Sequence, residues 1–239
     1  MQTAGAVIIG DEILSGKVQD ANTPHLIAML ARRGVRLGRI IVIGDDPQEI
    51  GAAVKAQAER FDHVFTSGGV GPTHDDRTVA AIAAAFGRPV VRHPELVALL
   101  TREIGAAPDD PALKMSEVVD GTQLLGGGPY PIMRFENVYI LPGVPQIFAA
   151  KIDAIAPTIG GAPLVVRRVY LDVRESHIAV RLAELEAALD GVRIGSYPRW
   201  GRGEYRVMVT FEHADAAPVD DGVARLVATL AEGELVRVE

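Results

Sequence analysis

The sequence contains no cysteine among its 239 residues. This absence excludes disulfide bonds, metal sites built from thiolates and cysteine nucleophiles. Long apolar runs are also missing, since no stretch approaches the roughly 18 uncharged residues that a membrane-spanning helix needs. The first residues lack the basic segment and the apolar stretch of a secretory signal peptide. From these absences we expect a cytoplasmic protein with no membrane segment.

An excess of basic residues is likewise absent. The chain has 24 Lys and Arg against 31 Asp and Glu, a formal net charge of −7, which disfavours nucleic-acid binding through bulk electrostatic attraction. The segment RIGSYPRWGRGEYR does interleave arginines with tyrosines and a tryptophan, a mixture that can stack on bases. The region 164–239 around it nevertheless holds 10 Arg against 13 acidic residues. Nucleic acid is therefore not an expected partner.

The first two thirds of the chain alternate apolar strand-like runs with helix-like segments. Helices are expected over residues 20–34, with Asn22 or Thr23 as the cap, and after Asp46, which should cap its own helix. Strands separated by helices of this length indicate βαβ units and a mainly parallel sheet covered by helices on both faces. The expected strands are residues 4–9, 35–44 and 62–66, and a fourth that ends near residue 141.

From residue 164 onward the pattern changes to strand, helix, strand, strand, helix, strand. This order is that of the split βαβ arrangement in ferredoxin-like domains. The segment IAPTIGGAPL, rich in Gly and Pro, is the expected linker. The sequence thus predicts two domains, residues 1–160 and residues 164–239.

Acidic and glycine-rich segments follow the expected strands of the first domain. In a parallel sheet the strands end at one side, here called the carboxyl end of the sheet, and ligands bind there. Segments far apart in the sequence should therefore meet. They are Gly10-Asp11-Glu12, Gly44-Asp45-Asp46, residues 67–76 and Leu141-Pro142-Gly143.

The segment TSGGVGPTHDDRT combines bare backbone with two aspartates. Glycines at positions 68, 69 and 71 allow a ligand to contact backbone N–H groups, which suits a phosphate. Carboxylates repel phosphate unless a cation such as Mg²⁺ bridges the two. A loop without ligand, Asp76 as a helix cap and Asp11-Glu12 as a solvated turn remain the structural alternatives.

Other phosphate and hydrolase motifs do not fit. GDEILSGK has one residue too many for a Walker A loop, and it is followed by Val18 where Ser or Thr should bind Mg²⁺. GGVGPTHDD lacks the third glycine of a dinucleotide-binding fingerprint. No histidine cluster suggests zinc, and no G-x-S-x-G nucleophile elbow is present.

The segments GDEILSGKVQDAN and TSGGVGPTHDDRT resemble the two signatures of the molybdopterin-binding MoaB/Mog-type domain family. LPGVPQIF resembles the Leu-Pro-Gly-x-Pro segment of one branch, which comprises competence/damage-inducible protein A (CinA) and the molybdopterin-binding-like domain of FAD synthases. The resemblance implies a three-layer α/β/α fold, a small α+β ferredoxin-like or KH-like domain after it, and a homo-oligomer, either a dimer or a trimer.

The same resemblance implies roles for individual residues. Asp45 and Asp76 match the functional aspartates and would be catalytic. Asp11 and Glu12 match the first acidic pair and would join Asp45 and Asp76 in holding a divalent metal, Mg, Mn or Co. The expected substrate- and phosphate-binding residues are Ser67, Gly68, Gly69, Val70, Gly71, Pro72, Asp75, Lys114, Pro142 and Gly143.

Two departures from the family bear on the substrate. Val70 stands where Mog-type proteins that adenylylate molybdopterin have a threonine, and LLGGGPYPIMRF differs from the Asn-containing segment of CinA proteins. The CinA branch is linked to metal-dependent hydrolysis of ADP-ribose, and the FAD synthase domain to hydrolysis of FAD. We therefore expect a metal-dependent pyrophosphatase whose partner is a small nucleotide or pterin phosphate. The alternative is a protein of molybdenum cofactor biosynthesis that binds or adenylylates molybdopterin.

Overall fold

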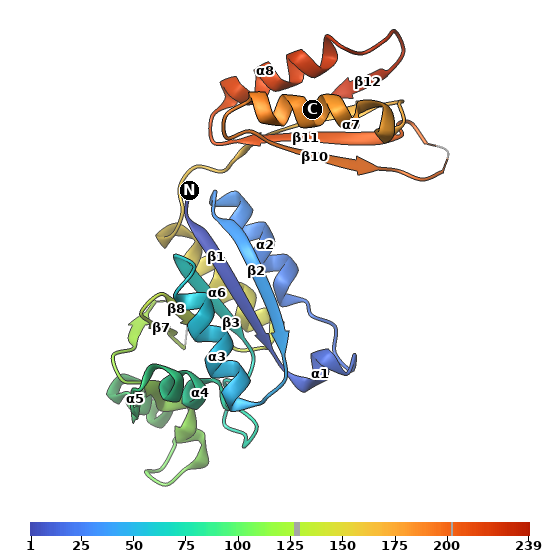
Figure 1. Ribbon diagram of the computed structural model, residues 1–239. Helices are drawn as coiled ribbons and strands as arrows, with labels where there is room; N and C mark the ends of the chain where they lie inside the picture. The colour runs from blue at the N-terminus through green and yellow to red at the C-terminus, as the bar shows by residue number, and fades with distance from the viewer. Residues whose placement is uncertain (127–129, 202) are drawn as a thin grey trace. The chain divides into compact units, whose positions relative to one another are not determined.

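The computed structural model describes residues 1–126, 130–201 and 203–239 (Figure 1). The chain divides into two compact units, Met1–Gly161 and Ala162–Glu239, each described here by itself. Part of the segment LLGGGPYPIMRF, residues 127–129, lies outside the described residues. Within the described residues, no helix is both long and apolar enough to cross a membrane.

The first unit is built on a six-stranded sheet of order β2-β1-β3-β8-β7-β6. Its four parallel strands are β2 (Arg36–Ile43), β1 (Thr3–Ile9), β3 (His63–Ser67) and β8 (Val138–Ile140). The strands β7 (Ile132–Phe135) and β6 (Gln123–Leu125) are antiparallel and make the sheet mixed. The prediction of a mainly parallel sheet is confirmed.

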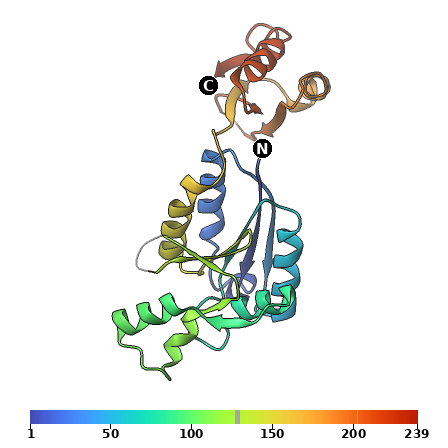
Figure 2. The ribbon, with the colours of Figure 1, turned by 90° about the vertical axis from the view of Figure 1, so that its left-hand side faces the viewer.

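Helices cover both faces of this sheet. On one face lie α2 (Asn22–Arg32) and α6 (Pro145–Ile155), whose Leu26 and Phe148 are fully buried. On the other lie α3 (Pro47–Ala58), α4 (Thr78–Phe86) and α5 (Pro94–Ile104), which bury Ile50, Ile82 and Leu96. Figure 2 shows the sheet between α2 and α6 on one side and α3 on the other. The predicted three-layer α/β/α fold is confirmed.

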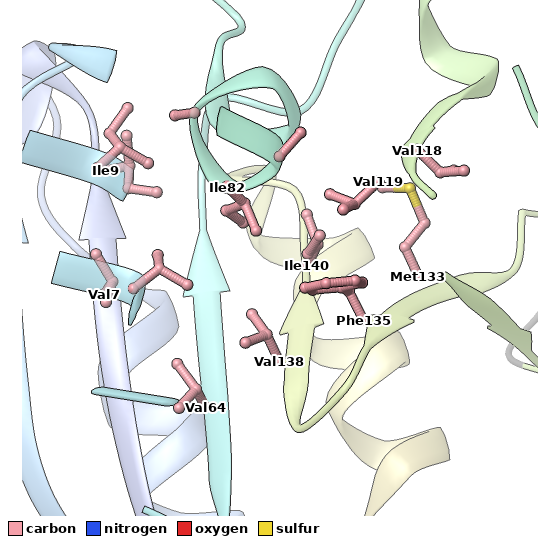
Figure 3. Packing of buried hydrophobic residues seen from close by; sticks show 14 of the residues in the cluster. Val7, Ile9, Val64, Ile82, Val118, Val119, Met133, Phe135, Val138 and Ile140 are labelled. Carbon is pink, nitrogen blue, oxygen red and sulfur yellow. The ribbon is translucent and has the colours of Figure 1, made fainter. Parts of the chain in front are cut away.

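Strand β1 is a continuous apolar run because it contributes side chains to the core on both faces of the sheet. Its side chains alternate, so Val7 and Ile9 pack in one core cluster and Ala4 and Ala6 in the other. In Figure 3, Val7 and Ile9 project from β1 next to β3, which carries Val64, and Ile82 of α4 is turned toward the strands. A strand buried on both faces has no polar side, which is why its sequence lacks the usual polar alternation.

One of two predicted helix caps is confirmed. The Asp46 carboxylate accepts hydrogen bonds from two backbone N–H groups of the first turn of α3, at 2.8 and 3.0 Å. The predicted cap of α2 is wrong, because Asp20 Oδ1 accepts from the backbone N–H groups of Asn22 and Thr23 at 2.9 and 3.1 Å. Since the Asp20 carboxylate caps the helix, the Asn22 side chain is available for other contacts.

Several short elements were not predicted. They are α1 (Asp11–Leu14), the antiparallel pair β4 (Val90–Arg92) and β5 (Glu117–Val119), and the 3₁₀ helices η1 (Pro111–Ser116) and η2 (Ala156–Thr158). Each is too short for a hydrophobic period to show in the sequence. The helix η1 positions Lys114 beside the glycine-rich loop.

The second unit contains the predicted strand-helix-strand-strand-helix-strand order. Its antiparallel sheet has the order β10-β11-β9-β12, and its helices are α7 (Glu175–Ala188) and α8 (Ala216–Val227). The strands are β9 (Val165–Leu171), β10 (Arg193–Pro198), β11 (Val207–His213) and β12 (Leu235–Val238). One core cluster, which includes Phe211, Ile178 and Leu226, joins the sheet to the two helices. This is the expected ferredoxin-like arrangement.

Candidate functional site

The four segments that follow β1, β2, β3 and β8 meet at the carboxyl end of the sheet. The Gly10 N–H donates to Ile43 O at 3.0 Å, and the Gly68 N–H donates to Leu141 O at 3.1 Å. A Cβ added to Gly68 would lie 2.1 Å from Ile9 O, so β1 and the glycine-rich loop are in direct contact. These contacts join segments that are up to about 130 residues apart in the sequence.

Gly68 and Gly69 are glycines for a structural reason. Both have positive φ angles, 110° and 63°, which side-chain-bearing residues rarely adopt. Both are also tightly packed, because a Cβ on Gly69 would lie 2.3 Å from the Thr78 hydroxyl oxygen. The backbone of the loop is therefore both bare and fixed.

Thr78, the first residue of α4, holds the loop in place. It is fully buried, its hydroxyl donates to Gly68 O at 2.9 Å, and its N–H donates to Gly69 O at 3.1 Å. Within the described residues, the N–H groups of Gly69, Val70 and Gly71 form no hydrogen bond to the protein. Three successive donors in the loop between β3 and α4 thus remain for a ligand.

Asn22 was not predicted as a site residue, although it is the last residue of the segment GDEILSGKVQDAN. Its side chain is 6% exposed, and its amide N–H₂ donates to Ser67 Oγ and to Gly143 O, both at 2.8 Å. Ser67 is itself buried, so its hydroxyl engages Asn22 within the protein. Asn22 therefore ties the end of β3 to the segment after β8, and both Ser67 and Gly143 act in holding the site together.

Asp11 and Asp45 lie together. The Asp11 N–H donates to Asp45 Oδ2 at 3.1 Å, and a Cβ added to Gly44 would lie 2.3 Å from Asp11 Oδ1. Glu12 turns back instead, with its carboxylate 2.5 Å from where a Cβ on Gly10 would stand. The ends of β1 and β2 thus present a pair of carboxylates.

Asp76 is not a helix cap. Its carboxylate accepts from the Thr73 N–H at 2.9 Å and from the Thr73 hydroxyl, within the same loop. It also stands over Gly71, where an added Cβ would lie 2.5 Å from Asp76 Oδ2. The alternative of Asp76 as the cap of α4 is wrong, because the helix begins two residues later with no side-chain cap.

A small cavity of about 40 Å³ lies on the loop, lined by Gly69, Val70, Gly71, Asp76 and Lys114 among others. The Lys114 ammonium donates to the Thr73 carbonyl oxygen and brings a positive charge beside the loop. Asp75 lies outside the cavity lining, exposed, with its carboxylate 4.0 Å from the ring of His74. Pro72 is likewise not among the lining residues.

A metal requires a donor set that suits it. Within the described residues, no group of three or more His, Asp or Glu lies close enough to hold a metal alone, so the four predicted ligands do not form one cluster. The Asp11–Asp45 pair nevertheless offers only oxygen donors. This fits a hard cation such as Mg²⁺, which retains waters and pairs one or two carboxylates with substrate phosphates.

A second, apolar cavity of about 240 Å³ adjoins the loop. Val70 and Met115 line both cavities, and Tyr130, Pro131, Met133, Ile140, Pro142, Ile147 and Lys151 complete the second. Burial raises the pKa of the Tyr130 hydroxyl to about 12. Pro142 therefore stands in the wall of an apolar cavity, not on the glycine-rich loop.

Lys151 is the charged residue of this cavity. It is only 4% exposed, and its ammonium donates to Tyr130 O and Pro131 O at 2.6 and 3.0 Å. Burial lowers the pKa of Lys151 to about 8. The sequence carried a signal that was missed, since residue 151 falls on the buried stripe of α6 with Phe148, Ile152 and Ile155.

Comparison with known proteins agrees with this architecture. Residues 5–161 match the family described as "Probable molybdopterin binding domain", and residues 163–239 match "FAD synthase, middle domain". A "Probable FAD synthase" of Caenorhabditis elegans is 32% identical over 96% of this chain and 50% of its own length. A "CinA-like protein" of Gemmatimonas aurantiaca is 34% identical over 80% of this chain and 49% of its own length.

This chain therefore spans about half the length of these two relatives. Among solved structures, the protein CinA of Thermoplasma acidophilum, described as of unknown function, is 30% identical with a TM-score of 0.60. The match covers 66% of this chain and 97% of that one. The chain belongs to the molybdopterin-binding domain family, with CinA-like proteins and FAD synthases as its relatives, and carries the FAD synthase middle domain after it.

Proposed function

We propose that this protein is a metal-dependent pyrophosphatase acting on a nucleotide diphosphate such as ADP-ribose or FAD. The observation that carries the proposal is the loop at the carboxyl end of the sheet. In the described residues, three successive backbone N–H groups, from Gly69 to Gly71, have no protein acceptor there. Successive backbone donors in a glycine-rich loop of this kind suit a phosphate group.

The acidic residues support a diphosphate ligand held with a cation. Asp11 and Asp45 would hold the metal, with Asp76 and Glu12 on the adjoining segments. When bound, a divalent metal lowers the pKa of a bound water and neutralises charge that develops on phosphorus. The residues of the chain bind and orient the diphosphate, and Lys114 adds a positive charge beside the loop.

The overall reaction consumes one water molecule. Its oxygen forms a new bond to one phosphorus atom while the bridging P–O bond breaks, and the second phosphate leaves on the bridging oxygen. ADP-ribose would give AMP and ribose 5-phosphate, and FAD would give AMP and FMN. The N–H groups of Gly69 to Gly71 would stabilise the charged phosphate oxygens in this step.

A second candidate is the binding or adenylylation of molybdopterin. It is supported by the description of the family that residues 5–161 match. The apolar cavity beside the loop would suit a pterin ring as well as a flavin ring. In either case we expect a homo-oligomer, dimer or trimer, whose mass in solution light scattering would establish.

The test is AMP release from ADP-ribose, FAD and ATP with Mg²⁺, Mn²⁺ or Co²⁺, and with EDTA. Asp45→Ala and Asp76→Ala should each lower the rate by at least a hundredfold, about 2.7 kcal/mol of transition-state stabilisation. Asp46→Ala is the matched control, because Asp46 caps α3 and its loss costs about 1 kcal/mol of stability without touching the site. No metal-dependent release from any nucleotide, combined with tight binding of molybdopterin, would favour the second candidate.

A further inference from the structure

Lys151 is a buried ammonium without a counter-ion among the described residues. Within the described part of the chain, no carboxylate forms an ion pair with it, and two backbone carbonyls are the acceptors it reaches. An ammonium has three N–H donors, so one donor is left over. A buried charge held only by two carbonyl dipoles and by the Tyr130 ring, whose centroid lies 5.4 Å from the ammonium, is costly unless a further acceptor arrives.

The cavity around Lys151 is suited to a flat ring. Its other walls are apolar or aromatic, and it contains about 240 Å³. This is less than the about 300–1,000 Å³ of a site that takes a whole drug-sized ligand, so the cavity fits one ring system and not an entire dinucleotide. Val70 and Met115 are shared with the loop cavity, which places the ring next to the bound phosphates.

We propose that this cavity binds a planar oxo-substituted heterocycle, of the isoalloxazine or pteridine type, and that Lys151 selects it by donating a hydrogen bond to a ring carbonyl oxygen. The inference rests on the proposed function and names the group attached to the diphosphate. Between the two substrates considered above, it favours FAD over ADP-ribose.

The preference follows from donor and acceptor chemistry. Lys151 can only donate, and a ring carbonyl is a strong acceptor that lies in the plane of the heterocycle. The ribose hydroxyls of ADP-ribose can also accept a hydrogen bond, but the second ribose is neither planar nor apolar enough to fill this cavity, and the adenine is common to both ligands. In an apolar cavity a charge-assisted hydrogen bond is shielded from water and is stronger than one at the surface.

The experiment measures the binding of FAD and of ADP-ribose by calorimetry in EDTA, where metal-dependent turnover is blocked. The two ligands share the ADP half, so a difference between them reports on the other half. Lys151→Met keeps most of the side-chain volume and removes the charge, and Lys151→Gln retains a neutral donor. Lys55→Met is the matched control, because Lys55 also donates to a backbone carbonyl, Ala85 O at 3.1 Å, but lies on α3 outside the cavity.

We expect Lys151→Met to weaken FAD binding about ten- to hundredfold and ADP-ribose binding less than about twofold. Lys151→Gln should lose less, and Lys55→Met should match wild type. An equal loss for both ligands, an unchanged affinity for FAD, or a wild type that binds FAD no more tightly than ADP-ribose overturns the proposal. If Lys151→Met fails to fold, as judged by thermal unfolding, Lys151→Gln decides between these outcomes.

AMP release in Mg²⁺ separates this inference from the proposed function. FAD binding that depends on Lys151 without AMP release would keep the ring site and remove the pyrophosphatase activity. AMP release from both ligands without any effect of Lys151 would keep the activity and remove the ring site.

Discussion

The two domains differ in where they place their polar groups. Among the described residues, eight buried polar or charged side chains lie in residues 1–161, and one, Thr210, lies in residues 162–239. The second domain instead carries exposed ion pairs such as Arg206–Asp172 at 2.7 Å. Buried polar groups that form hydrogen bonds, such as the Thr78 hydroxyl and the Asn22 amide N–H₂, fix a backbone in one arrangement, whereas exposed ion pairs contribute little. The first domain is therefore organised around a site, and the second around its apolar core.

The largest expected difference between the two domains is the loss of stability in Gly68→Ala. Gly68→Ala would set a Cβ 2.1 Å from Ile9 O at a φ of 110°, and backbone strain and overpacking together should lower the free energy of unfolding by about 4 kcal/mol. Gly233→Ala in the second domain is the control, because Gly233 also has a positive φ, 85°, with nothing near the added atom. It should lose only about 1 kcal/mol.

Urea unfolding of both variants measures the difference. Equal losses would mean that φ alone determines the effect and that close packing at the carboxyl end of the sheet contributes nothing. The two domains would then not differ in how tightly these glycines are packed.

The position of this loop could be predicted from the sequence, because parallel strands end at the same side of a sheet and glycine-rich segments follow them. The contacts that hold it could not. Asn22 reaches Ser67, 45 residues away, and near a helix start an asparagine is as readily interpreted as a cap. Only the position of the Asp20 carboxylate, which caps α2 instead, leaves the Asn22 amide free for Ser67.

Lys151 illustrates the same limit. Its place on the buried stripe of α6 can be read from the helical period, but a lysine there is ordinarily taken as a surface residue whose stem packs. What decides its role is the pair of carbonyls from Tyr130 and Pro131, which belong to a segment before β7. Such pairings depend on tertiary structure and leave no local pattern in the sequence.

Asn22 gives the second largest effect. Asn22→Leu removes two hydrogen bonds and leaves Ser67 Oγ and Gly143 O without their donor, which should lower the free energy of unfolding by about 3 kcal/mol. AMP release should fall as well, because the loop loses the hydrogen bonds that hold it to the segment after β8. In the second domain, Thr210→Val removes the one buried polar side chain of the described residues and should cost about 1 kcal/mol. A loss of stability in Asn22→Leu with full activity would show that the tie does not position the site.

Lys151 predicts a pH dependence for the stability of the first domain. Its pKa is about 8 in the folded protein against 10.5 in the unfolded chain, so between these values the unfolded chain binds more protons and stability rises with pH. From pH 7 to 9.5, wild type should gain about 2 kcal/mol relative to Lys151→Met. Urea unfolding at both pH values measures this, and the tyrosines common to both proteins cancel in the difference. A constant difference would mean that Lys151 titrates normally.

The smallest effect should come from the exposed pair Arg206–Asp172. Both side chains are about half exposed, 57% and 52%, so solvent screens their attraction and a double-mutant cycle with alanine should give a coupling of about 0.5 kcal/mol. The corresponding cycle of Asn22→Leu with Ser67→Ala should give about 1.5 kcal/mol, because that hydrogen bond is buried. Raising the salt concentration to 1 M should abolish the first coupling and leave the second unchanged. Couplings of equal size would contradict the proposed difference between the domains, since the second domain would then depend on specific polar contacts as much as the first.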